Sequence, residues 1–137
     1  MSEVLILGEV KEGSLNTRTL ELLGAGKKLA GETGGGFSLL LMGDGISGVA
    51  DQTLSYGPTR VYKVEHPLLQ GFQADLWLKA LEQTCREIKP KILLMSHAFI
   101  GMEIGPRLAC RMNTRLTTDC IDLSIDPVDG LLLRTKP

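Results

Sequence analysis

The 137-residue sequence has little of what marks the specialised classes of protein. Aromatic residues make up 4% of the chain, and it contains only two histidines and three cysteines. Basic and acidic residues nearly balance, which leaves a formal net charge of −1. The lack of a basic excess argues against nucleic-acid binding, because such proteins gather cations to neutralise phosphates. The few histidines and cysteines show no spacing typical of a metal site.

Long apolar runs and an N-terminal targeting pattern are also absent. The first apolar run covers only Val4 to Leu7, and no basic segment precedes it. A membrane-spanning helix needs about 20 apolar residues, so the sequence predicts neither a signal peptide nor a span. Cys85, Cys110 and Cys120 are odd in number and form no C-x-x-C pair, which favours small buried side chains in a reducing compartment. We therefore expect a cytoplasmic protein.

Short aliphatic runs and glycines are what the sequence has in quantity. At 43% hydrophobic and 23% charged residues, the chain is typical of one folded domain, residues 1–137, with a single core. Continuous apolar character predicts strands of a parallel sheet that are covered on both faces. Such runs occur at Val4–Leu7, Leu39–Met42, Val61–Val64 and Ile92–Met95.

Helical patterns separate these runs. Asn16 is a typical N-cap for a first helix that ends near Gly34. The fourth expected helix has Pro106 in its first turn, where a missing N–H is harmless. The second, third and fourth helices are expected at Ser47–Tyr56, Gln73–Ile88 and Glu103–Met112.

Strand and helix alternate four times, which predicts right-handed crossovers and a doubly wound, three-layer α/β fold with a mainly parallel sheet. The end of the chain differs. The segments Cys120–Ile125 and Leu131–Arg134 flank "DPVDG", whose Asp-Pro and Asp-Gly pairs are turn signals. They predict a C-terminal β-hairpin. Because the sequence stops just after a strand, we expect it to be a segment of a longer protein.

The stretch "LLLMGDGISGVA" contains a G-x-G-x-x-G pattern formed by Gly43, Gly45 and Gly48. It follows a predicted strand and opens a predicted helix, and Glu65 lies at about the distance that a dinucleotide fingerprint requires. However, 16 glycines give about 0.2 such matches by chance. The pattern also follows the second strand, not the first. We therefore favour a strand-to-helix turn in which Gly48 permits close packing, and an adenine-nucleotide site remains the alternative.

Ligands of doubly wound sheets bind beyond the carboxyl ends of the strands. Ser96 and His97 lie there, but neighbours in an extended chain point to opposite sides and do not easily form a nucleophile–base pair. We predict no catalytic residue and no metal site. The polar residues expected at this rim are Glu9, Asp44, Glu65, His66, Ser96 and His97.

Three arginines recur every four residues along the fourth expected helix: Arg107, Arg111 and Arg115. They indicate either an exposed helix flank or a face that binds an anion. The exposed flank is favoured for Arg111 and Arg115. Arg107 stays open, with Asp119 or Asp122 as candidate partners.

Three long segments resemble the electron transfer flavoprotein alpha subunit. The opening "VLILGEVKEGSLNTRTLELLGAGKKLA" is similar to the family's first strand, its "L-N" loop and its "T-L-E-L-L" helix. The segment "LLLMGDGISGVADQTLSYGPTRVYKVEHPLL" is similar to the second and third strands. The segment "KPKILLMSHAFIGMEIGPRLACRMNTRLTTDCIDLSID" is similar to a glycine-led helix with Pro-Arg and a following "D-C". These last features are Gly101, Pro106, Arg107, Asp119 and Cys120.

The chain departs from the family at Met102-Glu103, where a basic residue is usual, and at Thr114-Arg115-Leu116, where "T-G-L" is common. The resemblance implies a Rossmann-like fold of the adenine nucleotide alpha hydrolase type. It also implies a heterodimer with a beta subunit, in which FAD carries electrons from dehydrogenases to a quinone reductase or a similar acceptor.

In that family the FAD is held mainly by the C-terminal domain of the alpha subunit, which this sequence lacks. The resemblance therefore implies that this chain is the N-terminal scaffold domain, that it pairs with the beta subunit, and that it has no cofactor of its own. A free-standing adenine-nucleotide-binding domain that uses the Gly43–Gly48 loop is the alternative.

Overall fold

The computed structural model describes residues 4–11, 13–96, 99–116, 122–125 and 132–135. Its central sheet has four parallel strands in the order β5-β4-β1-β6. This order confirms the mainly parallel α/β sheet expected from the apolar runs. The strands are β1 (Val4–Gly8), β4 (Phe37–Gly43), β5 (Arg60–Glu65) and β6 (Ile92–Leu94).

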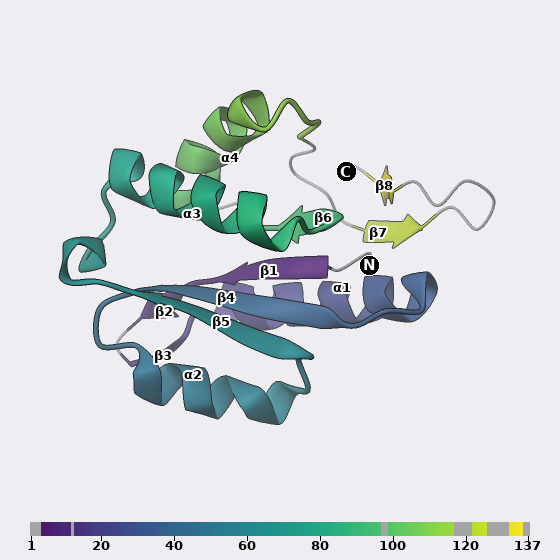
Figure 1. The fold of residues 1–137 in the computed structure, drawn as a ribbon. Coiled ribbons are helices and arrows are strands. Elements are labelled where there is room, and N and C mark those ends of the chain that lie inside the picture. The colour runs from purple at the N-terminus through teal and green to yellow at the C-terminus, as the bar shows by residue number, and fades with distance from the viewer. Residues whose placement is uncertain (1–3, 12, 97–98, 117–121, 126–131, 136–137) are drawn as a thin grey trace.

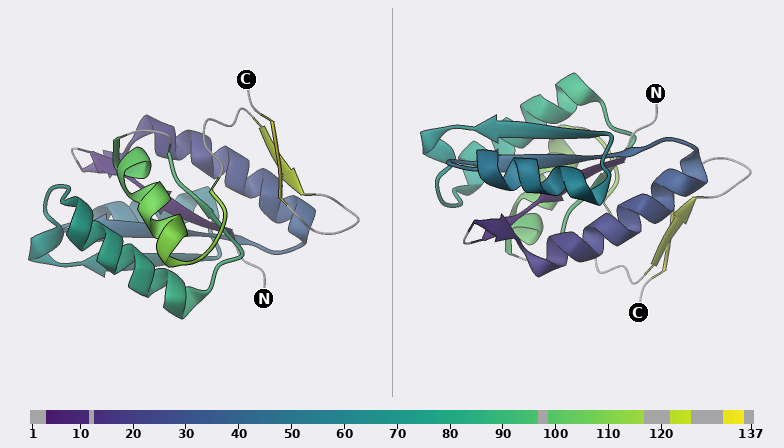
Figure 2. Two further views of the ribbon diagram at one scale, coloured as in Figure 1. Left: turned by 90° about the horizontal axis from the view of Figure 1, so that it is seen from above. Right: turned by 90° about the horizontal axis from the view of Figure 1, so that it is seen from below.

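Helices cover both faces of the sheet (Figure 1). The helices α1 (Thr17–Thr33) and α2 (Ser47–Thr53) lie on one face, and α3 (Ala74–Ile88) and α4 (Phe99–Arg111) lie on the other. Figure 2 shows the first pair from below and the second pair from above. The chain moves outward from β1 to β5 and then returns to the far side of β1, so the helices change face at that point. The expected three-layer fold is confirmed.

Alternating side chains of β1 explain why its sequence is continuously apolar. Val4 and Ile6 pack toward α1 and α2, whereas Leu5 and Leu7 pack toward α3 and α4. All four side chains are almost fully buried. The neighbouring strand β4 repeats this arrangement with buried residues on both faces, as a strand in the middle of a two-sided sheet must.

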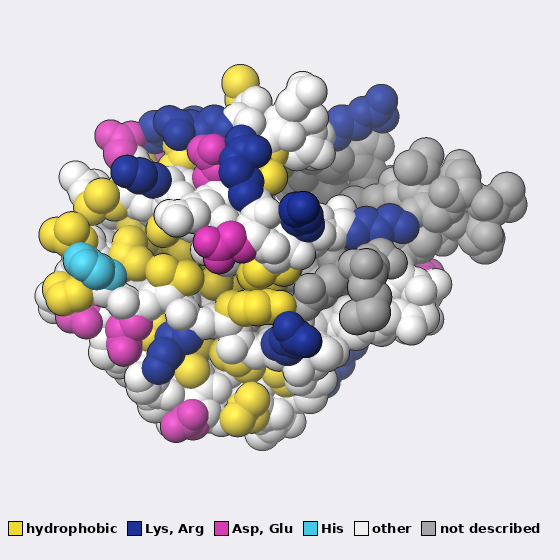
Figure 3. Space-filling model, in the orientation of Figure 1, with side chains coloured by type: hydrophobic (Ala, Val, Ile, Leu, Met, Phe, Trp, Pro, Cys, Tyr) yellow, Lys and Arg dark blue, Asp and Glu magenta, His cyan; other side chains and the backbone are white. Residues whose placement is uncertain are grey.

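Strand β5 differs because it forms an edge of the sheet. Arg60, Lys63 and Glu65 are exposed, and the apolar residues between them are only partly buried. The prediction that every apolar run is covered on both faces is therefore wrong for β5. Figure 3 shows hydrophobic side chains at the surface along this edge, between the two helical layers.

The expected ends of three helices are confirmed. The Asn16 side chain accepts a hydrogen bond from the N–H of Arg18 (2.9 Å), and Gly34 ends α1 in the left-handed conformation (φ 75°). Helix α2 continues into a short 3-10 turn, η1 (Leu54–Tyr56), which ends at Gly57. Helix α3 begins and ends as its apolar stripe predicts.

Helix α4 begins earlier than predicted, at Phe99, so the placement of Pro106 in its first turn is wrong. Proline in a helix interior leaves the carbonyl four residues before it without its usual donor. Met102 and Pro106 both lie on the exposed side of α4, where water can hydrogen-bond that carbonyl. On the opposite side, Ile104 and Leu108 are buried against the sheet. This packing holds the helix across the proline.

Two small antiparallel pairs lie outside the central sheet. The pair β2 (Val10–Lys11) and β3 (Ser14–Leu15) follows β1 and was not predicted. The pair β7 (Asp122–Ile125) and β8 (Leu132–Thr135) confirms the expected hairpin, and β7 runs beside α1 (Figure 1). The turn at 126–131 lies outside the described residues.

Candidate functional site

The carboxyl ends of the parallel strands form one rim of the sheet, where ligands bind in doubly wound folds. Strand order reverses between β1 and β6, so the switch point lies between these two strands. The polar residues predicted for the rim lie at or just after the strand ends, whereas His97 lies outside the described residues. The placed ones are Glu9 after β1, Asp44 after β4, Glu65 and His66 at the end of β5, and Ser96 after β6.

Glu9 lies at the switch point and connects β1 to the first helix. Its N–H donates to Thr19 Oγ1 (2.9 Å), and its carbonyl accepts from the N–H of Asn16 (2.7 Å). Burial raises the pKa of the Glu9 carboxyl, and the positive charge of Arg18 opposes this effect. The polar backbone atoms of Glu9 are therefore committed to holding the start of α1.

On the other side of the switch point, Ser96 is buried after β6. A Cβ atom on Gly101 would collide with the carbonyl oxygen of Ser96, so α4 passes directly against the chain that leaves β6. Glycine is required here because the two backbones approach so closely.

The glycine loop lies after β4, one strand away from the switch point. Gly45 adopts the left-handed conformation (φ 65°), which favours glycine. The carbonyl of Gly43 accepts a hydrogen bond from the N–H of His66 (3.0 Å), and the N–H of Ile46 donates to Glu65 Oε2 (2.8 Å). The end of β5 thus holds the loop at two points.

The third glycine of the pattern has no packing role. A Cβ atom on Gly48 would meet no atom within 4 Å, because this residue lies on the exposed side of α2. The prediction that Gly48 permits close packing is therefore wrong. In a dinucleotide fingerprint the third glycine does allow close helix–strand packing.

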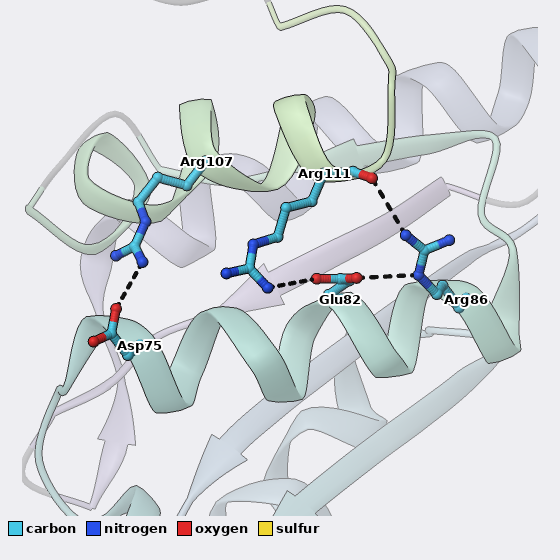
Figure 4. A network of polar contacts seen from close by, with 5 residues as sticks. All are labelled: Asp75, Glu82, Arg86, Arg107 and Arg111. Atoms are coloured by element: carbon cyan, nitrogen blue, oxygen red, sulfur yellow. Dashed lines mark hydrogen bonds and ion pairs between the residues drawn. The ribbon is translucent and has the colours of Figure 1, made fainter.

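The arginines of α4 join it to α3 (Figure 4). Arg107 pairs with Asp75 (2.6 Å), and Arg111 pairs with Glu82 (3.1 Å). Glu82 also pairs with Arg86 (3.1 Å), which in turn donates to the carbonyl of Arg111 (3.2 Å). These contacts form a polar clasp between the two helices.

The clasp gives Arg107 a partner that no sequence pattern indicated. Asp119 and the side chain of Asp122 lie outside what the structure describes, whereas Asp75 contacts Arg107 from the neighbouring helix. Hydrogen bonds from Arg111 and Arg86 lower the pKa of the Glu82 carboxyl. The i,i+4 spacing of Glu82 and Arg86 is the one signal by which part of the clasp could have been found.

The described cysteines differ in environment. Cys85 is buried, and burial raises the pKa of its thiol to about 11. Cys110 is exposed on α4, so the prediction of buried cysteines is wrong for this residue. It lies on the side of the helix that faces away from Leu108 and the core. Cys120 lies outside the described residues.

Among the residues that the structure describes, no three His, Cys, Asp or Glu side chains are grouped as they would be around a metal ion. His66 caps the short 3-10 turn η2 (Pro67–Leu69), because its Nδ1 accepts the N–H of Leu68 (3.1 Å). No helix in the described ranges combines the length and the apolar character needed to cross a membrane.

Comparison with known proteins relates this chain to one family. The electron transfer flavoprotein domain matches residues 4–136. The electron transfer flavoprotein subunit alpha of Thermoanaerobacterium thermosaccharolyticum is 36% identical over 135 residues, 98% of this chain and 41% of that protein. Its counterpart in Clostridium acetobutylicum is 37% identical over 134 residues, 98% of this chain and 40% of that protein.

A third relative carries a more specific name. The acryloyl-CoA reductase electron transfer subunit beta of Anaerotignum propionicum is 35% identical over 124 residues, 90% of this chain and 34% of that protein. The chain thus spans about two fifths or less of the length of these relatives. The resemblance to the alpha subunit seen in the sequence is confirmed, and the chain belongs to the electron transfer flavoprotein family.

Proposed function

We propose that this chain is the N-terminal domain of an electron transfer flavoprotein alpha subunit and that it pairs with a beta subunit. The observation that carries the proposal is the match over residues 4–136, which takes in all the described strands and helices but only two fifths of the alpha subunits. In this proposal the complete heterodimer carries electrons from dehydrogenases to a quinone reductase or a similar acceptor. Its FAD is held mainly by the remainder of the alpha subunit.

The domain itself contributes binding surface and support in this proposal, with no catalytic residue and no resident cofactor. Two observations favour this proposal, and they concern the glycine loop and the arginines of α4, which the sequence offered as candidate binding sites. The Ile46 N–H in the glycine loop is bonded to Glu65, and Arg107 and Arg111 are paired with acids of α3. We place the complex in the cytoplasm on the sequence features given above.

Co-expression of this chain with the beta subunit of the same organism tests the pairing. We expect an affinity tag on this chain to retain the beta subunit in equal molar amount through gel filtration. Recovery of this chain alone, although both proteins are expressed and folded, would contradict the proposal.

The alternative, an adenine-nucleotide-binding domain, is favoured by one observation, the glycine pattern between a strand and a helix. Calorimetric titration of the chain with AMP, ATP, NAD and FAD separates the two functions. Saturable binding tighter than a Kd of ~1 mM, about −4 kcal/mol, would support the alternative. Our proposal predicts no heat of binding in that range.

A further inference from the structure

The acidic residue that made the glycine pattern look like a nucleotide site has a different contact in the structure. Glu65 is the last residue of β5, and its Oε2 accepts the N–H of Ile46 (2.8 Å). Both of its carboxylate oxygens also lie 3.5 Å from Ser47 Oγ. The carboxylate therefore lies at the end of the loop that an anion would approach.

A lysine of the same strand extends this contact. Lys63 and Glu65 are two residues apart, so their side chains leave the same face of β5, the face that α2 covers. Lys63 Nζ donates to Ser47 Oγ (2.9 Å), and the Ser47 hydroxyl in turn faces the Glu65 carboxylate. Three polar side chains thus connect the edge strand to the first turn of α2.

We propose that Glu65 is an internal anion that occupies the donors of the Gly43–Gly48 loop and prevents an external phosphate from binding there. The inference deepens the proposed function and rests on it, since that function assigns no nucleotide to this domain. A charged hydrogen bond of this kind is roughly twice as strong as a neutral one, and a phosphate would have to replace it.

The backbone of the loop agrees with this role. The left-handed Gly45 directs the N–H of Ile46 toward β5, and the bond from the His66 N–H to Gly43 fixes the start of the turn. Asp44, the acidic residue inside the glycine pattern, is exposed, and we assign it no part in holding the loop.

NMR spectroscopy of the ¹⁵N-labelled chain at constant pH tests the contact. We expect the Ile46 amide resonance to move upfield in Glu65→Gln, which keeps the size of the side chain, because a neutral amide oxygen is a weaker acceptor than a carboxylate. The resonance should keep its position in Asp44→Asn. An Ile46 amide that is unchanged in Glu65→Gln, or that moves in Asp44→Asn, would overturn the proposal.

Titration with inorganic phosphate, and separately with AMP, tests the exclusion. We expect no change at the Ile46 and Ser47 amides of the unaltered chain up to ~1 mM ligand, and saturable changes there in Glu65→Gln. The matched control Gly48→Ala should behave like the unaltered chain. Saturable binding at the loop of the unaltered chain, or none in Glu65→Gln, would overturn it. Failure to pair with a beta subunit would leave these amide shifts unchanged, so the two proposals fail separately.

Discussion

The two helical layers are attached to the same sheet in different ways. In the α1–α2 layer, Gly26 lies so close to Ile6 that an added Cβ would collide with the isoleucine side chain. In the α3–α4 layer, large side chains such as Trp77 and Leu81 fill the space, and the polar clasp closes the surface. The packing of α1 on β1 therefore depends on a missing side chain at Gly26, whereas the packing of α3 depends on its large side chains.

The largest effect is expected from removing a buried side chain of the α3–α4 layer. Leu81→Ala should lower the free energy of unfolding by about 2–5 kcal/mol, because it removes a fully buried side chain and leaves a cavity. Urea denaturation followed by circular dichroism measures this. The control Lys79→Ala, at an exposed position of the same helix, should change stability by less than about 0.5 kcal/mol. Equal losses for both variants would contradict the packing described here.

A smaller effect is expected from adding a methyl group to a glycine of α1. Gly26→Ala should cost up to about 2 kcal/mol, because overpacking against Ile6 outweighs the gain in helix propensity. Gly24→Ala, in the same helix but with open space around the position, should stabilise the chain by about 0.5–1 kcal/mol. The same denaturation measurement applies. If the two variants changed stability in the same direction, α1 would not pack on β1 as described.

The smallest effect concerns the clasp and depends on pH. The folded-state pKa of Glu82 lies below its ordinary value of 4.5, so its ion pairs stabilise the fold above that pH. The contribution is lost as the pH falls through the folded-state pKa. Glu82→Gln should therefore be less stable than the unaltered chain near pH 6, and this difference should shrink as the pH falls through the folded-state pKa of Glu82. A stability difference that stayed constant with pH would exclude the carboxylate as its source.

The same contrast between layers explains what the sequence could predict. The apolar stripe of α3 predicted the helix and its buried face, because side-chain packing leaves a periodic pattern. Asn16 and Gly34 predicted the ends of α1, because caps are local. Contacts that depend on a missing side chain leave no such pattern, so Gly26 and Gly48 could not be told apart before the fold was seen.

The candidate site was less predictable, because its contacts join residues far apart in the chain. The sequence indicated Glu65 as the acidic residue of a possible dinucleotide fingerprint, but not as the residue that accepts the Ile46 N–H. The pairing of Arg107 with Asp75 depends on how α3 and α4 lie together, which no local pattern encodes. Likewise, the exposed edge at β5 follows from strand order and not from its apolar run.

In the proposed function, this domain of the electron transfer flavoprotein family provides structural support and pairs with a beta subunit, while the flavin is held mainly by the remainder of the alpha subunit. The visible absorption spectrum of the purified chain, after incubation with excess FAD and desalting, tests it most directly. We predict a colourless protein with no flavin absorbance. Flavin retained in equal molar amount would contradict the claim.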